Sequence, residues 1–339
     1  MNKIFPFPRW VKETGVLKSN VLIIIPGLLL LPVLFGNRNI EGLNYTTVEK
    51  INPDKRYSSD DKKCLDCHAA LFEKTIKHTT STGKECEDCH KSNGSEHPKT
   101  GITSFLLAEK LPDLCLSCHD KIKNAISKSH FIHGSLTDNK SCLNCHSPHS
   151  SSEKGLLTAI KREVCFSCHN KTITGKSGTI LNIEQLYTNS EVKHPPVKKC
   201  SSTCHNPHAS DFKHLLSNAY PEDEYAPANA DSFALCFICH EDMDLIEAPK
   251  TNAATAFRNG EGNLHYVHVH GEKGRKCTLC HSPHATKNEH LIRDAVKFGN
   301  FEFKLNYKSD STGGSCFPGC HVEKKYNRLM IKSDSLLNK

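Results

Sequence analysis

Two cysteines three positions apart, followed at once by a histidine, recur along this sequence. A second form of the motif has one more residue between the cysteines, and we call each copy of either form a hook. The seven regular hooks are Cys64/Cys67/His68, Cys86/Cys89/His90, Cys115/Cys118/His119, Cys142/Cys145/His146, Cys165/Cys168/His169, Cys236/Cys239/His240 and Cys277/Cys280/His281. The two longer hooks are Cys200/Cys204/His205 and Cys316/Cys320/His321. Together the hooks use all 18 cysteines of the chain.

The histidine that ends each hook decides which chemistry the hook can support. Structural zinc sites use Cys-x-x-Cys pairs, disulfide frameworks use even numbers of cysteines, and thioredoxin-type sites use a single pair. None of these requires a histidine directly after the second cysteine. Attachment of c-type haem does, because the thiols bond to the porphyrin vinyl groups and the adjacent histidine binds the iron. The hooks therefore predict nine covalently attached c-type haems with the hook histidines as proximal ligands.

The remaining histidines are candidates for the opposite face of each iron. The chain has 22 histidines, so 13 remain for nine positions. Methionine cannot fill these positions, because only Met1, Met243 and Met330 are present and Met243 lies too close to a hook to swing over its haem. Two ligands of the histidine type favour low reduction potentials. We expect the distal ligands among His78, His97, His130, His133, His149, His194, His208, His265, His268 and His284, which is one candidate too many.

The spacing of these histidines reveals a repeat. After a solitary hook at 64–68, four units follow, each with an upstream histidine, a hook, a trailing histidine, a leucine-rich pair and a second hook. Units two and four carry the matched pairs His130/His133 and His265/His268, whose i, i+3 spacing places two imidazoles on one helical face. The trailing His149 follows a proline, so we expect it to reach an iron other than that of His146. The predicted nonahaem domain spans 64–321, with repeats at about 78–119, 130–169, 194–240 and 265–321.

Composition indicates that the polypeptide cannot build a large core of its own. Aromatic residues make up 7% of the chain, and the mean hydropathy is −0.49. The porphyrins must then supply much of the buried apolar surface, so the protein without haem should not fold. We expect a mostly irregular fold of short helices and long loops wrapped around haems. The alternating Phe301–Tyr307 stretch predicts at most one short β-hairpin.

The net charge of +7 does not indicate a nucleic-acid partner. Nine haems would bring about 18 propionate charges and about nine ferric charges, which leaves roughly −2 for the loaded protein. Basic runs interleaved with aromatic residues are also missing from the sequence. We therefore expect no nucleic-acid binding.

The N-terminal sequence is typical of an exported protein. Residues 1–20 are basic, residues 21–36 are uncharged and apolar, and residues 37–63 form a polar linker. The apolar segment could be a cleaved signal or a membrane anchor, because its 16 residues are short for a membrane span and contain two prolines. In either case the haem region lies outside the cytoplasm, in the periplasm, tethered to the membrane or at the cell surface. A polar tail occupies 322–339.

This organisation resembles the multihaem c-type cytochromes with a doubled Cys-x-x-Cys-His motif, over about 64–321. Unit one, with its Cys86-to-Pro98 segment, is more similar to the periplasmic decahaem electron conduits. The resemblance implies stacked, mostly six-coordinate haems that carry electrons, and chains that sometimes associate into filaments. The implied partners are redox proteins or a quinol-linked donor.

Three functions are compatible with these observations. We expect an electron-transfer protein without an enzymatic site, since every hook ends in histidine and distal histidines are in surplus. A multihaem reductase or dehydrogenase of a small nitrogen or sulfur species would need one open iron. A quinol-oxidising cytochrome would use residues 21–36 to associate with the membrane.

Overall fold

The computed structural model describes residues 59–330 except 80–85, 99–100, 102, 176–177, 201–202 and 227. The chain divides into two units, residues 1–53 and 54–339, and all described residues lie in the second. The predicted basic segment, apolar segment and most of the linker lie outside the described residues. Within 59–330, with the gaps given, no helix has the length and apolar character needed to cross a membrane.

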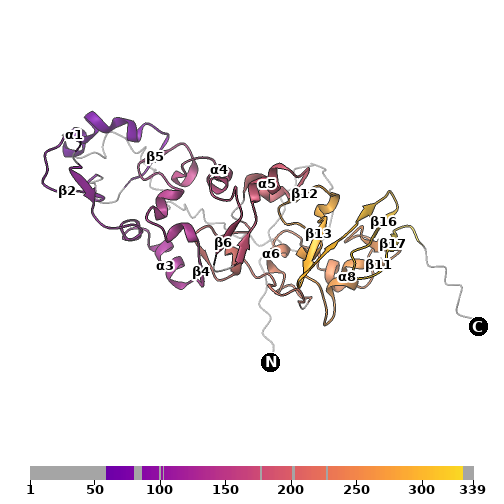
Figure 1. Ribbon diagram of the computed structural model, residues 1–339. Coiled ribbons are helices and arrows are strands. Elements are labelled where there is room, and N and C mark those ends of the chain that lie inside the picture. Colours follow the sequence, from indigo (N-terminus) through magenta and orange to yellow (C-terminus); the bar gives the residue numbers. More distant parts are fainter. Residues whose placement is uncertain are drawn as a thin grey trace, which may run out of the picture. The chain divides into compact units, whose positions relative to one another are not determined.

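Short helices separated by loops account for most of the described fold, as the sequence predicts (Figure 1). The α-helices are α1 (Ser59–His68), α2 (Asp113–Leu116), α3 (Asp120–Lys128), α4 (Lys161–Phe166), α5 (Ile183–Thr188), α6 (Ala234–Phe237), α7 (Asp244–Glu247) and α8 (Leu264–Val269). The 3-10 helices are η2 (Ala69–Phe72), η3 (Gly134–Leu136), η4 (Ser141–Asn144), η5 (Lys154–Leu156), η6 (Pro195–Lys199), η7 (Lys213–Leu215), η8 (Cys277–Leu279) and η9 (Glu289–Leu291). Helix α1 begins five residues before the first hook, inside the segment predicted to be a linker.

Five of the nine hooks lie in single helical turns. In the second hooks of units one to three, the first cysteine lies in α2, α4 or α6, and its carbonyl accepts the amide of the hook histidine at 3.0–3.1 Å. The first hooks of units two and four lie in η4 and η8 with the same bond, from His146 to Cys142 and from His281 to Cys277. One closed turn places both thiols and the imidazole on the same side of the backbone. This explains why helices this short form at the hooks.

The prediction of at most one hairpin is wrong, because the described chain contains 17 short strands in eight small sheets. The strands are β1 (Ile76–Lys77), β2 (His90–Ser92), β3 (Phe105–Leu107), β4 (Phe131–Ile132), β5 (Ser150–Ser151), β6 (Ile173–Gly175), β7 (Gly178–Ile180), β8 (Val192–Lys193), β9 (Ala209–Ser210), β10 (Arg258–Asn259), β11 (Gly262–Asn263), β12 (Ala285–Thr286), β13 (Ala295–Phe298), β14 (Phe301–Lys304), β15 (Lys308–Ser309), β16 (Gly313–Cys316) and β17 (Lys324–Asn327). The alternating stretch at Phe301 does form a hairpin, β13–β14. Most other strands have two to four residues, too few to show an alternating pattern.

Three of the sheets join one repeat to the next. Strand β1 of unit one pairs with β5 of unit two, β4 of unit two pairs with β9 of unit three, and β8 of unit three pairs with β12 of unit four. All three pairings are antiparallel. Each one joins the residues before an upstream histidine to the residues after the trailing histidine of the following unit.

The apolar core is small and lies in the C-terminal third. Ala226, Phe233, Ile246 and Val269 form one buried cluster beside α6, α7 and α8. Among the described residues, every buried apolar side chain lies at position 209 or beyond. Units one and two therefore have too little internal packing to explain their fold, which agrees with the expectation that another group supplies apolar surface.

Candidate haem-binding site

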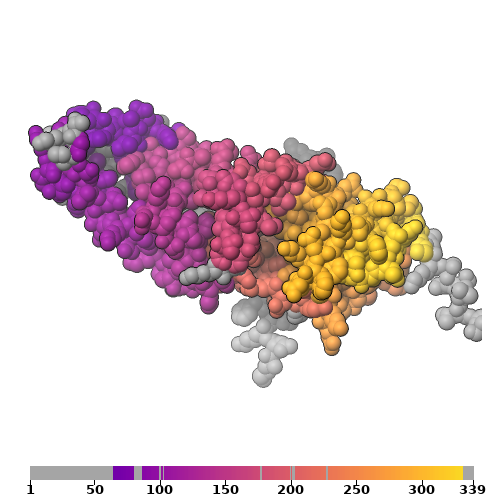
Figure 2. Space-filling model, viewed as in Figure 1, coloured from indigo at the N-terminus to yellow at the C-terminus, as the bar shows by residue number. Residues whose placement is uncertain are grey.

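A continuous cavity of about 4750 Å³ follows the hooks from Cys64 to His321. All 18 cysteines, all nine hook histidines and all ten distal candidates line it. Shared among nine hooks, this is about 530 Å³ each, within the roughly 300–1,000 Å³ typical of sites for small ligands and cofactors. The space-filling view shows hollows between the indigo and magenta segments (Figure 2).

Inside the cavity, eight of the nine hook histidines face a second histidine. The ring centroids lie 6.0–6.3 Å apart, and seven of the eight pairs are inclined by only 7–20°. A metal held by two imidazole nitrogens at roughly 2 Å each needs ring centroids about 6 Å apart. The residues present therefore fit a haem iron between each pair. The pairs are His68–His97, His90–His149, His119–His78, His146–His208, His169–His133, His205–His284, His240–His194 and His281–His265.

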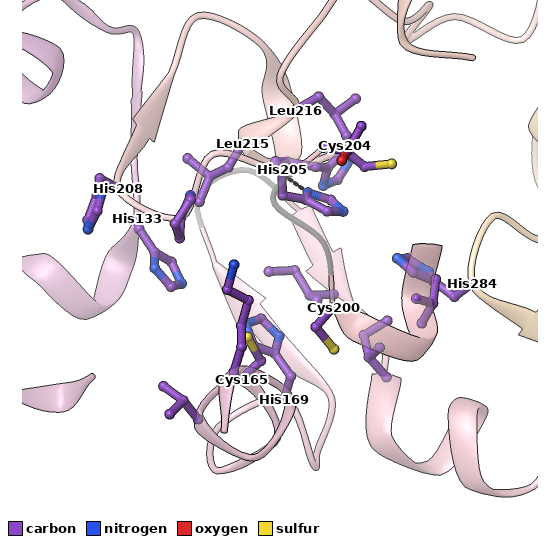
Figure 3. A pocket seen from close by; sticks show the side chains of 18 of the residues that line it. His133, Cys165, His169, Cys200, Cys204, His205, His208, Leu215, Leu216 and His284 are labelled. Carbon is purple, nitrogen blue, oxygen red and sulfur yellow. Dashed lines mark hydrogen bonds between the residues drawn. The ribbon is translucent and has the colours of Figure 1, made fainter. Parts of the chain in front are cut away.

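The pairs follow a rule that the sequence did not reveal. A trailing histidine faces the first hook of the preceding unit, as His149 faces His90 and His208 faces His146, and His97 faces the solitary hook. An upstream histidine faces the second hook of its own unit, as His133 faces His169 (Figure 3). The structure thus places the ring of His149 opposite that of His90 and not opposite that of the adjacent His146.

The small sheets between units position both kinds of histidine at once. The amide of His133 donates to the carbonyl of His208 at 3.0 Å, directly beside the β4–β9 pairing. The equivalent bonds join His78 to His149 at 2.8 Å and His194 to His284 at 3.0 Å. Because each pair shares a backbone bond but the two side chains face different hooks, one junction positions a histidine at each of two hooks.

In units two, three and four, the histidine of the first hook is oriented through its second ring nitrogen by a carbonyl nine residues further on. The Nδ1 of His146 donates to the carbonyl of Gly155 at 2.7 Å. His205 and His281 donate in the same way to the carbonyls of His214 and His290, at 2.9 and 2.8 Å. Such a partner fixes the tautomer and leaves Nε2 free for the metal. Sequence reasoning missed this role, although the acceptor always directly precedes the leucine-rich pair.

The acceptor position explains why His214 and His290 are not placed as ligands. They occupy left-handed backbone conformations with φ of 58° and 54°, where unit two has Gly155 with φ of 73°. The leucine that follows each acceptor is also left-handed, and this turn aims the carbonyl at the hook. Leu215 and Leu216 line the cavity beside His205 (Figure 3). Both residues therefore contribute their backbone to the site, as the leucine-rich pairs contribute apolar surface.

Burial favours the metal-binding, neutral form of seven of the eight histidines that face a hook histidine. Removal from water lowers the pKa of His78, His133, His149, His194 and His208. It lowers the pKa of His265 and of His284 to about 4. A neutral imidazole has a free nitrogen lone pair, whereas a protonated one cannot bind a metal.

Two of the ten candidate distal ligands, His130 and His268, do not face a hook histidine among the described residues. His130 is exposed and its Nδ1 lies 3.1 Å from Asp211 Oδ1, with no hook histidine within ring contact among the described residues. His268 lies in α8, and its Nδ1 donates to the carbonyl of Leu264 at 2.6 Å. His321 is the one hook histidine without a facing ring among the described residues, and its Nδ1 donates to the carbonyl of Val322 at 2.6 Å.

Neighbouring hooks lie next to one another in chain order. Burial and then the charge of Cys142 raise the pKa of Cys115 to about 12, and burial and then Cys200 raise the pKa of Cys165. The same effects raise the pKa of Cys280 to about 11, with Cys316 as the first charged neighbour. These interactions require the thiols of successive hooks to be close. Cys89 with Cys118, Cys145 with Cys165, Cys204 with Cys239 and Cys236 with Cys277 complete the series from the second hook to the ninth.

The sequence is similar to known haem proteins over part of its length. A family model described as "Doubled CXXCH motif" matches residues 78–124, 133–174 and 194–245, which are the first three units. The multihaem cytochrome MtrA of Shewanella baltica (strain OS185) is 32% identical over 114 residues. That alignment covers 32% of this chain and 29% of the relative, so the chain matches less than a third of that protein's length.

These matches agree with the geometry of the cavity. The motif that the family model describes is the one that forms the hooks, and its three matches begin at or beside the upstream histidines. Motifs of this kind hold c-type haem covalently, and multihaem cytochromes transfer electrons. We conclude that this chain is a multihaem c-type cytochrome with doubled Cys-x-x-Cys-His motifs.

Proposed function

We propose that the protein holds nine haems, each between two histidines, and carries electrons along them. The observation that supports this most strongly is the set of eight facing histidine pairs at 6.0–6.3 Å. A c-type haem in such a site takes up and releases one electron at its iron without binding a substrate. The chain's own residues hold both axial positions and orient the imidazoles.

The order of the hooks supports a continuous path. Thiols of successive hooks are close from Cys89 to Cys316, so neighbouring haems would lie side by side along the cavity. The trailing histidines connect each unit to the preceding one, and therefore maintain this spacing across the unit boundaries. We propose that electrons enter and leave at the two ends of the series, through redox protein partners or a quinol-linked donor.

The proposed location is outside the cytoplasm. Covalent attachment of haem to thiols takes place on the exported side of the membrane, and the basic and apolar segments at 1–36 are typical of export. Periplasmic, membrane-tethered and cell-surface locations are all compatible with this proposal. Self-association into longer haem chains would extend the same path.

A second candidate function has one observation in its favour. His321 has no facing imidazole among the described residues, and a reductase of small nitrogen or sulfur species would need such an open iron. The two functions differ in the spin state of the ninth iron. An open iron is high-spin or binds carbon monoxide, whereas an iron with two histidines is low-spin and does neither.

The experiment is to count haems and spin states in the full chain. Protein made in a strain that attaches c-type haem should gain a mass equal to nine haems, and magnetic resonance should show only low-spin iron in the oxidised state. Electron transfer is supported further if all haems are reduced at low potential without binding carbon monoxide. A smaller haem count, or one equivalent of high-spin iron that binds carbon monoxide, would contradict the proposal and favour the reductase.

A further inference from the structure

The fourth unit breaks the rule that the first three follow. In those units the iron site of the first hook receives its second histidine from the trailing segment of the next unit. Residues 322–339 contain no histidine, so none of them can face His281 in that way. The structure instead places His265, from the same unit, opposite His281 at 6.1 Å and 20°.

His265 reaches this position because α8 replaces an extended segment. In units one to three the upstream histidine follows a two-residue strand that pairs with the next unit. In unit four the equivalent segment is α8, capped by Asn263, whose side chain accepts the amides of His265 and Tyr266. The Asn263 amide also donates to three carbonyls of the α7 region, those of Asp244, Leu245 and Ala248, and the residue is fully buried. The helix is therefore held rigidly against the core cluster.

The second member of the pair, His268, occupies the position of the upstream histidines. It precedes its hook by nine residues, as His133 does in unit two. In unit three, the upstream His194 is oriented by the carbonyl of Pro283 from the next unit, at 3.1 Å. In unit four, the carbonyl of Leu264 takes over that role for His268, from within α8.

Aromatic contacts through Phe257 connect both histidines of α8 to the sheet that carries Cys316. Its ring lies 5.7 Å from that of Phe257, which packs edge-on against Tyr326 at 5.1 Å. Tyr326 belongs to β17, the strand that pairs with β16 and its terminal residue Cys316. Both His268 and His321 line the cavity, and both donate Nδ1 to a carbonyl, which leaves Nε2 of each free.

We propose that His265 and His268 together complete the end of the haem series. His265 takes the place of the trailing histidine of a following unit at the eighth iron, and His268 is the distal ligand of the ninth. His130, which stands in the same relation to His133 as His265 does to His268, has no such role, because His208 already faces the hook of unit two. All nine irons are then six-coordinate within one chain. This inference rests on the proposed function.

The test compares His265→Met and His268→Met with the matched control His130→Met, all in the full haem-loaded chain. Methionine still binds iron, so folding is preserved, and a methionine bound to a haem iron has a methyl proton resonance shifted strongly upfield by the ring. We expect one such resonance from each of the first two variants and none from the control. Each substitution should also raise the reduction potential of one haem, since methionine ligation raises the potential.

A second set of variants, made in a protein that lacks the ninth haem, assigns each histidine to its haem. Cys316→Ala/Cys320→Ala removes the ninth haem, and the loss is checked by mass. In that background His265→Ala should still produce one equivalent of high-spin iron, whereas His268→Ala should produce none. The inference is overturned if His268→Ala leaves every iron low-spin in the complete chain, or if His130→Met produces the shifted resonance.

Failure of this inference is distinguishable from failure of the proposed function. If the unsubstituted chain holds nine low-spin haems but neither α8 variant changes them, the function stands and the ligand assignment is wrong. If the unsubstituted chain already has a high-spin iron that His268→Ala does not alter, the ninth site is open and both are wrong.

Discussion

Units one to three and unit four position their upstream histidines in different ways. Units one to three have their upstream histidines beside two-residue strands that pair with the following unit. Unit four has its histidines on α8, beside the buried cluster of Phe233, Ile246 and Val269 and near the three-stranded sheet β15–β16–β17. The histidines of units one to three are positioned by contacts with a neighbouring unit, whereas those of unit four are positioned by contacts within it. The difference shows that a junction between units and a local core can both position histidines at the hooks.

Removal of the haems should change the stability of the two regions more than any substitution does. Protein made without haem attachment should lose its structure, because the described residues before 209 contain no buried apolar side chain. Amide hydrogen exchange and circular dichroism measure this directly. We expect no protection in units one and two, with any residual protection confined to α6, α7 and α8. Native-like circular dichroism of the haem-free protein would show that the polypeptide core is sufficient.

A substitution in the core cluster should lower the stability of unit four but not that of units one and two. Phe233 is fully buried, so Phe233→Ala should destabilise the terminal unit by about 3–5 kcal/mol through lost burial and a cavity. Hydrogen exchange in the haem-loaded protein should show faster opening around α6–α8 and unchanged protection in units one and two. Ile160→Ala, at a side chain that is 42% exposed and does not line the cavity, is the control and should have little effect. Equal loss of protection throughout would mean that the core stabilises the inner units as well.

The smallest change in stability should come from a substitution at a single junction between two units. The Ser210 hydroxyl, in β9, donates to the carbonyl of Leu216 and accepts the amide of Phe212, next to the pairing of units two and three. Ser210→Ala should therefore cost about 1 kcal/mol, and hydrogen exchange should locate the change at that junction. Ser127→Ala, on the exposed face of α3, is the control and should be neutral within about 0.5 kcal/mol. A change spread over all four units would argue against independent junctions.

Sequence patterns revealed the class of protein but not its sheets. The doubled motif predicted a multihaem c-type cytochrome, and the family match confirms this. Short helices and irregular loops were also predicted correctly. The hairpin at Phe301 was visible because its strands alternate, whereas the junction strands have only two residues each and pair across distances of about 75–95 residues. The haem count, the axial ligands and the location outside the cytoplasm stay predictions.

The sequence by itself predicted where haem attaches, because the two cysteines and the histidine of each hook are close together in the chain. It also reduced the distal ligands to ten candidates. Only the tertiary structure decided which candidate faces which hook, since the partners lie far apart, as His90 and His149 do. It separated His130 from His265, two residues in identical local patterns, because His130 lies beside Asp211 whereas His265 faces the hook histidine His281. Covalent attachment is a local property of the chain, whereas ligand placement depends on how successive units pack.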